Sequence, residues 1–478
     1  MRTTASTTVV PRRGATRAAA ALPVPPRLAE PDARWDLLLL CLAGYLLASV
    51  GRVHQLFPLL GLVRPAILTG AIALGIYLFG TRVRGRAADL RWPATKAVLA
   101  LLGWMVLSVP GSLSPGTSLA TITGDFAKTV AMLLVVIGAV RGLRDVQRLA
   151  AVYLAAAATY AAVVIARFDL GGGESWRLGD LYYYDANDFA TFAVSAMPLA
   201  VYFVHAARRR RSRILAASAL TTLALGLVWS GSRGGFLALL AVAAFVLLRY
   251  RAIPVRWRIG ATAVVAVVVT ATASDRYWKQ MGTIVEDADY NRTDESGRLQ
   301  IWQRGIGYML QYPLLGVGAN NFGAAEGLLS PFAYRQQFGV GVRWNAAHNS
   351  FVQVGAELGV PGLVFLVAVI ASALAALRAV GRRAAEGDAA AADGAPLAQA
   401  LTASLAGFVV GAFFLSLAYS AMLYTLVALA VALRKVSAPP RTGRRSEVPW
   451  LQRRPCAPPP RSTTAACAPW ASPRSTGG

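Results

Sequence analysis

The stretch "HNSFVQVGAELGVPGLVFLVAVIASALAAL", residues 348–377, begins with polar side chains and continues into a long apolar run. The apolar part can cross a bilayer, because a membrane-spanning helix needs about 17 to 25 mainly apolar residues. The run over 349–380 is too long for one untilted span, and Pro361 suits the first turn of a helix. We therefore expect a short helix over 348–358, followed by a membrane span over 360–378.

Similar apolar stretches recur along most of the chain. Of its 478 residues, 56% are hydrophobic and 15% are charged, and its mean hydropathy is +0.49. This composition is far more apolar than that of a soluble domain. We expect an all-α integral membrane protein with about twelve transmembrane helices. The expected spans lie near 36–51, 56–80, 94–110, 119–140, 146–166, 188–206, 214–230, 234–249, 259–274, 360–378, 399–415 and 417–433.

The basic residues alternate with these spans. The net charge of +25 could indicate nucleic-acid binding, but the Lys and Arg residues are spread over the chain rather than gathered in one domain. Basic clusters such as "RRRRSR" at 208–213 follow even-numbered spans, whereas the connection over 110–125 contains no Lys or Arg. By the positive-inside rule, both termini are cytoplasmic and the odd-to-even connections face outward. Membrane lipids are expected partners, and nucleic acid is not.

This topology divides the chain into five segments. Residues 1–34 are rich in Arg, Ala and Pro and contain no signal-peptide core, so we expect an uncleaved, disordered, cytoplasmic N-terminus. Spans one to nine cover 35–274, and spans ten to twelve cover 360–435. Between them, 275–359 is expected to be one long extracytoplasmic loop with short helices. The Pro-, Ser- and Arg-rich tail over 436–478 is expected to be disordered in the cytoplasm.

The long loop contains the helical pattern "SGRLQIWQRGIGYMLQYPLLGVGANNF", residues 296–322. It predicts a helix that ends before Pro313 and lies on the membrane surface or against the bundle. The apolar face of this helix consists of Leu299, Trp302, Ile306 and Met309. "GVGANN" has Asn321 where a dinucleotide fingerprint needs its third glycine. With no phosphate loop or metal-ligand spacing elsewhere, we expect neither a cofactor nor a metal.

A polar stripe opens the stretch quoted first. Asn349, Gln353 and Glu357 are spaced by four residues, so they share one helix face, and His348 lies where the helix begins. The stripe can face a cavity or the loop, because polar side chains facing lipid are costly, and its residues would there bind substrate by orienting the imidazole or the acceptor. Alternatively, His348 and Asn349 cap the helix while Gln353 and Glu357 face water.

The turn "SGSRGG", residues 230–235, presents one cation, Arg233, between glycines that let a bulky ligand approach. A guanidinium suits phosphate, because it can donate two parallel hydrogen bonds to phosphate oxygens. The alternative is an interfacial arginine that reaches the lipid headgroups.

The expected outward connection "RFDLGGGESWRLGDLYYYDANDFA", residues 167–190, combines aromatic rings with polar groups, among them Arg177, Asp185 and Asn187. Rings that stack and side chains that bind hydroxyl groups suit a sugar ligand. Interfacial tyrosines are also common in membrane proteins of any function.

Four motifs in order, "SGSRGG", "GRLQIWQRGI", "PLLGVGANNF" and "AHNSFVQVGAELGVPGL", resemble those of the O-antigen ligase and polysaccharide polymerase superfamily. The resemblance implies a GT-C-like multi-pass glycosyltransferase in the bacterial cytoplasmic (inner) membrane, active on the periplasmic or exterior side. It implies transfer from an undecaprenyl diphosphate carrier without metal or cofactor, in cell-envelope polysaccharide or lipopolysaccharide synthesis. Residues matching the family's functional positions are Arg233, Arg298 and His348. The segment "YYYDANDFA" departs from the family pattern, because Ala186 stands where proline is common.

The chemistry of these residues fits such a transfer. Breaking a sugar–diphosphate bond develops negative charge, which Arg233 and Arg298 would offset. His348 could take the proton of an acceptor hydroxyl or bind phosphate as a cation. We expect a ligase or polymerase that joins a lipid-linked glycan to a glycan or glycolipid acceptor. A polysaccharide transporter or flippase is the alternative, although such proteins usually carry ionisable groups near the midplane and related halves.

Overall fold

The computed structural model describes residues 35–80, 86–167, 176–178, 183–286, 294–295, 297–334 and 346–438. All regular secondary structure in these residues is helical, as the sequence predicts. The expected cytoplasmic N-terminus over 1–34 lies outside the described residues, and so does the expected tail from 439 onward. Residues 436–438 are described and form the end of the last helix and the turn after it.

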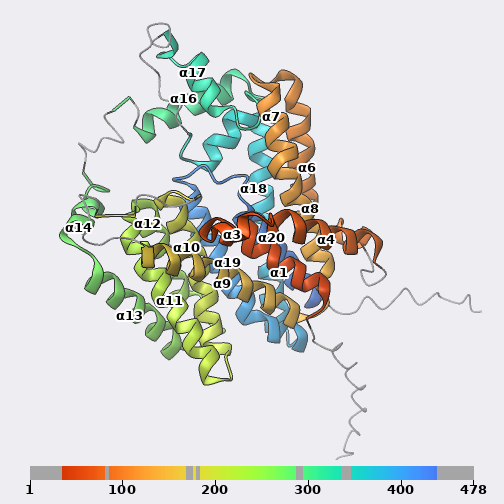
Figure 1. The fold of residues 1–478 in the computed structure, drawn as a ribbon, viewed down its shortest axis with the longest axis vertical. Helices are drawn as coiled ribbons and strands as arrows, with labels where there is room; N and C mark the ends of the chain where they lie inside the picture. Colours follow the sequence, from red (N-terminus) through yellow and green to blue (C-terminus); the bar gives the residue numbers. More distant parts are fainter. Residues whose placement is uncertain are drawn as a thin grey trace, which may run out of the picture. The chain divides into compact units, whose positions relative to one another are not determined.

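The helices follow one another without an intervening strand in the described part of the chain (Figure 1). The first half contains α1 (Leu37–Ser49), α2 (Val53–Leu56), α3 (Pro58–Gly61), α4 (Pro65–Phe79), α5 (Arg86–Asp89), α6 (Pro93–Ser108), η1 (Val109–Gly111), α7 (Pro115–Thr121), η2 (Ile122–Phe126), α8 (Ala127–Ala139), α9 (Leu143–Arg167), α10 (Ala186–Ala206) and α11 (Arg210–Ser230). The second half contains α12 (Arg233–Leu248), α13 (Val255–Thr272), α14 (Asp275–Gly282), α16 (Arg298–Gln311), α17 (Phe322–Leu329), α18 (Ser350–Ala385), α19 (Ala389–Ala412) and α20 (Ala421–Val436).

Nine helices in the described part are long and apolar enough to cross a membrane. They are Leu59–Phe79, Pro93–Gly111, Pro115–Ala139, Leu143–Arg167, Ala186–Ala206, Arg210–Ser230, Val255–Thr272, Ser350–Ala385 and Ala389–Ala412. α1 and α12 are apolar but shorter, at 13 and 16 residues. Each stretch expected to span overlaps a helix, so the described part of the chain is all-helical and has the helices of a multi-pass membrane protein. The count of twelve spans is not confirmed.

α10 and α19 lie at the centre of the bundle (Figure 1). α10 packs against α9, α11, α12 and α19, and most of its side chains are buried. The two central helices approach closely, since a Cβ added at Gly411 of α19 would lie 2.3 Å from Oγ1 of Thr191 in α10. Close packing at small residues holds membrane helices together, because no hydrophobic driving force acts between helices in lipid.

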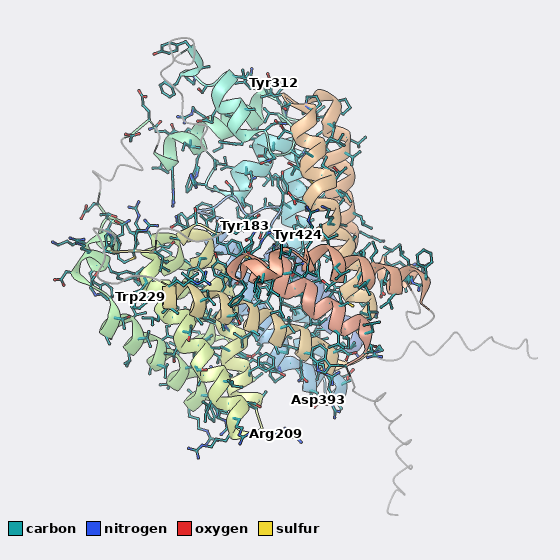
Figure 2. All side chains as sticks on the ribbon, viewed as in Figure 1. Tyr183, Arg209, Trp229, Tyr312, Asp393 and Tyr424 are labelled. Carbon is teal, nitrogen blue, oxygen red and sulfur yellow. The ribbon has the colours of Figure 1, made fainter. Side chains whose placement is uncertain are left out.

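The basic connections and the candidate turns lie at different ends of the helices. Figure 2 shows Arg209, just before α11, and Asp393, in α19, at one end of the bundle, whereas Trp229 and Tyr183 lie away from that end. This arrangement agrees with the alternation of basic connections that the topology was based on. The side of the membrane that each end faces stays a prediction.

α16, α17 and the first turns of α18 share a small hydrophobic core, which we call the loop core. Its buried side chains are Ile301, Tyr308, Val317, Phe322, Ala325, Ala347 and Ala356. The helix predicted before Pro313 is confirmed as α16, and two residues of its expected apolar face, Trp302 and Met309, pack against Phe413 and Gly355. Leu299 and Ile306 are 39% and 45% exposed, because α16 turns Gly305 toward Val352 of α18. That the exposed face of α16 lies on the membrane surface stays a prediction.

α18 consists of two helical parts that meet at Gly359, whose φ of 68° and ψ of −170° are not helical. The first part corresponds to the predicted short helix, and the second part to the predicted span. Pro361 follows the break directly. The predicted division of this run is therefore confirmed.

Candidate active site

Arg233 is the first residue of α12, and the turn before it is held by local hydrogen bonds. Ser232 caps the helix, because its Oγ accepts a hydrogen bond from the Gly235 backbone N–H at 3.1 Å. The half-buried Arg233 donates from Nη1 to Thr283 Oγ1 at 2.7 Å. Thr283 lies at the end of α14, so the first turn of the long connection folds back onto the "SGSRGG" turn.

Arg177 lies beside the same turn. The backbone N–H of Leu178 donates to the Trp229 carbonyl at 2.8 Å, which ties residues 176–178 to the end of α11. A Cβ added at Gly231 would lie 3.5 Å from the Arg177 Cβ. The structure therefore places Arg177 beside the turn that carries Arg233.

Asp185 and Asn187 lie at the start of α10, next to the start of α12. Asp185 is exposed and caps α10 by accepting hydrogen bonds from the backbone N–H groups of Asn187 and Asp188, both at 2.7 Å. A Cβ added at Gly235 would lie 2.6 Å from the Ala190 Cβ, so the first turns of α10 and α12 touch. The carboxylate of Asp185 is placed on the same end of the bundle as Arg233.

His348 precedes α18 and interacts electrostatically with two other predicted residues. Its backbone has a positive φ of 48°, and its N–H donates to Ser416 Oγ at 3.0 Å. Burial and the charge of Arg298 lower the pKa of the imidazole below its ordinary value, while the charge of Asp185 opposes them. Both charges therefore act on His348, and the balance favours a neutral imidazole at pH 7.

The polar stripe of α18 lies inside the protein. Asn349, Gln353 and Glu357 are 2%, 6% and 1% exposed, so the interpretation in which Gln353 and Glu357 face water is wrong. The capping part of that interpretation is confirmed for Asn349, whose Oδ1 accepts hydrogen bonds from two backbone N–H groups of the first turn. Glu357 accepts from the Tyr419 hydroxyl at 2.8 Å. It lies about 12 Å along the helix from Asn349, away from His348.

The motif "PLLGVGANNF" packs onto the end of the first part of α18. The N–H groups of Val317 and Gly318 donate to the Ala356 and Glu357 carbonyls at 2.9 and 2.8 Å. Trp104 of α6 donates from Nε1 to the Leu358 carbonyl at 3.0 Å. The helix end is thus capped by a distant loop, because its last carbonyls have no partners within the helix. Two of the motifs behind the resemblance form one structural unit.

A buried ion pair that sequence reasoning missed braces α16. Arg304 Nη2 lies 2.5 Å from Glu326 Oε2, and the Tyr308 hydroxyl donates to Glu326 Oε1 at 2.7 Å. Arg304 and Glu326 side chains are 13% and 1% exposed. The pair joins α16 to α17 and thereby fixes the helix that carries Arg298. Their separation of 22 residues across a turn gives no periodic signal in the sequence.

In the part of the chain that the structure describes, no three His, Cys, Asp or Glu side chains are grouped so that they could hold a metal ion. Metal independence of the reaction stays a prediction. The structure places Arg177 beside the turn of Arg233, and it places Arg298 and Asp185 where their charges act on His348.

Residues 216–367 match the family model of the O-antigen ligases. The match supports the resemblance of the chain to the O-antigen ligase and polysaccharide polymerase superfamily. The matched O-antigen ligase domain runs from α11 to the second part of α18, so it contains Arg233, Arg298 and His348. The match supports a membrane enzyme of the ligase or polymerase type. Asp185 and Arg177 lie before the matched region. A comparison with curated proteins found no match to the chain.

Proposed function

We propose that the chain transfers a glycan from an undecaprenyl diphosphate carrier to a glycan or lipid-linked glycan acceptor at the outer face of the bacterial cytoplasmic membrane. The observation that carries the proposal is the match of residues 216–367 to the O-antigen ligases, a region that contains Arg233, Arg298 and His348. This domain favours the enzyme over the transporter or flippase that composition also allowed. The acceptor distinguishes a ligase from a polymerase, and the acceptor is proposed to contact the long connection over 275–359.

In the proposed reaction, an acceptor hydroxyl oxygen attacks the anomeric carbon of the donor sugar. The bond from that carbon to the phosphate oxygen breaks, and the lipid diphosphate leaves with the bonding electrons. Arg233 and Arg298 would offset the charge on the leaving group. One guanidinium about 4 Å from a phosphate charge contributes on the order of 4 kcal/mol at an effective dielectric constant near 20.

His348 is proposed to accept the proton of the acceptor hydroxyl. Its lowered pKa supports a base over a phosphate-binding cation, because the imidazole is neutral in the free enzyme near pH 7. Asn349 is proposed to fix the position of His348 through the helix cap, while Gln353 and Glu357 support that helix from within. Arg177, Asp185 and Asn187 are proposed to contact the glycan.

The test uses Arg233→Lys with Arg249→Lys, at the other end of α12, as the matched control. Lysine keeps the charge but loses the planar fork, so Arg233→Lys is expected to raise the donor KM by about tenfold or more. Transfer is measured with purified protein and polyprenyl diphosphate-linked glycans. No transfer from such donors by the unchanged protein, or equal kinetics for the two variants, would overturn the proposal.

A further inference from the structure

An apolar cavity of about 240 Å³ lies between α10, α11, α12 and α13. It follows α12 from Phe236 to Val246, a length of about 15 Å at the rise of an α-helix. Its facing wall on α13 includes Val265 and Thr270, and the Thr270 hydroxyl is satisfied by the Ala266 carbonyl at 2.9 Å. The cavity is therefore long, narrow and apolar, which suits a hydrocarbon chain better than water.

The wall formed by α13 is thin. Only 6% of the α13 span is buried, and Val269 is its one buried residue. In Figure 1 this helix lies at the edge of the bundle beside α11. Because α13 is a span with lipid on its far side, a hydrocarbon chain can reach the cavity from the membrane without crossing the protein core.

One end of the cavity adjoins Arg233. Phe236, which lines the cavity, follows Arg233 by three residues and so lies on the same side of α12. Phe236 also packs edge to face against Tyr277 of α14, with ring centroids 6.5 Å apart. The same segment supplies Thr283, the partner of Arg233 at 2.7 Å. A cation thus lies at the entrance of an apolar cavity.

Tyr277 adds a polar group at this end. Its hydroxyl is buried and has no hydrogen-bond partner among the residues that the structure describes. Burial raises its pKa to about 12, so the hydroxyl remains protonated and can donate to an anion. A buried hydroxyl without a partner is costly, and a ligand that accepts its hydrogen bond would remove that cost.

We propose that this cavity holds the first part of the hydrocarbon chain of the lipid diphosphate donor, with the diphosphate at Arg233. The inference rests on the proposed function and adds the site that aligns the carrier. The hydrocarbon chain enters the cavity from lipid rather than from water, so its burial contributes little binding free energy. The cavity serves to fix the direction of the chain, and thereby the position of the diphosphate.

Two valines of α13 give a matched test. Val265 lines the cavity, whereas Val267 is 63% exposed and does not. Purified full-length protein in detergent is tested for binding of a long-chain polyprenyl diphosphate and a short-chain prenyl diphosphate. The unchanged protein and Val267→Trp are expected to prefer the long chain. Val265→Trp is expected to reduce that preference by about three- to tenfold, a modest change because detergent also solvates the chain.

Thermal unfolding checks that the variants are folded, and Ala261→Phe, which fills the cavity from another position, is the second variant. The proposal fails if Val265→Trp and Ala261→Phe keep the long-chain preference, or if the unchanged protein has none. A long-chain polyprenol serves as the separate control for the phosphate. If the polyprenol binds as tightly as the polyprenyl diphosphate, the cavity still holds the hydrocarbon chain, but the role of Arg233 in the proposed function is lost.

Discussion

Gly359→Ala tests whether the junction between the two parts of α18 holds the candidate site together. A Cβ at this position would lie 2.4 Å from the Leu314 carbonyl oxygen and 2.5 Å from that of Pro313. Both neighbours are backbone atoms, so neither can rotate away as a flexible side chain could. The loop over 313–318 must therefore separate from the helix end that it caps.

The cost can be worked from three contributions. The φ of 68° and ψ of −170° belong to a region that only glycine occupies readily, which costs another residue about 1 to 3 kcal/mol. Separation of the loop also breaks the hydrogen bond from the Val360 N–H to the Pro313 carbonyl, now 2.8 Å, at about 1 kcal/mol. The contacts with the two oxygens add to these terms. The total of about 2 to 4 kcal/mol or more is a large part of the stability of a typical domain.

The matched control is Gly307→Ala on α16, where an added Cβ meets nothing within 4 Å. There alanine is expected to be neutral or to stabilise the helix by up to about 1 kcal/mol. Thermal unfolding, hydrogen exchange of the N–H groups of Val317 and Gly318, and single-turnover transfer are compared for the two variants. Equal unfolding temperatures and equal transfer would refute the reasoning that this junction fixes the site.

Three further predictions concern the charges of the site. Arg298→Gln is expected to raise the pKa of His348, and Asp185→Asn is expected to lower it. The acid limb of the profile of kcat/KM against pH measures both shifts. If both variants shifted this limb in the same direction, the opposite electrostatic effects of the two residues would be contradicted. Arg304→Met is expected to destabilise the protein by about 3 to 5 kcal/mol, since it leaves the Glu326 carboxylate buried without its partner. The double variant Arg304→Met with Glu326→Gln is expected to recover part of this loss in thermal unfolding. If it recovers none, the ion pair does not stabilise the protein. Transfer is expected to persist in a chelator, because guanidinium groups offset the developing charge; complete loss that magnesium restores would contradict an arginine-only mechanism.

The membrane fold could be predicted from the sequence because its signal is local. Runs such as the one over 360–378 are apolar all round, and the break before Pro361 depends on the residues at the break itself. The signal was weaker where a span is short. α12 has 16 residues, so composition alone did not establish the number of helices that cross the membrane.

The orientation of the polar stripe could not be predicted, because it depends on contacts between distant segments. Glu357 is buried against Tyr419, which follows it by 62 residues, and against a loop that precedes it. Periodicity shows that three polar residues share a face, but it does not show what covers that face. The Arg304–Glu326 pair was missed for the same reason. The resemblance pointed to Arg298 and His348 as functional positions, and the charge of Arg298 lowers the pKa of His348.

Four residues of the candidate site lie at the N-terminal ends of four helices. Arg233 and Arg298 begin α12 and α16, Asp185 caps α10, and His348 lies directly before the cap of α18. Helix N-termini carry partial positive charge, which adds to the two guanidinium groups and favours an anion such as a diphosphate. Burial and the charge of Arg298 lower the pKa of His348 and keep its imidazole neutral before the donor binds. The negative charge of a bound diphosphate would then raise its pKa and make it a stronger base, so the acid limb of kcat should lie at a higher pH than that of kcat/KM. Coincident limbs would mean that donor charge and His348 do not interact.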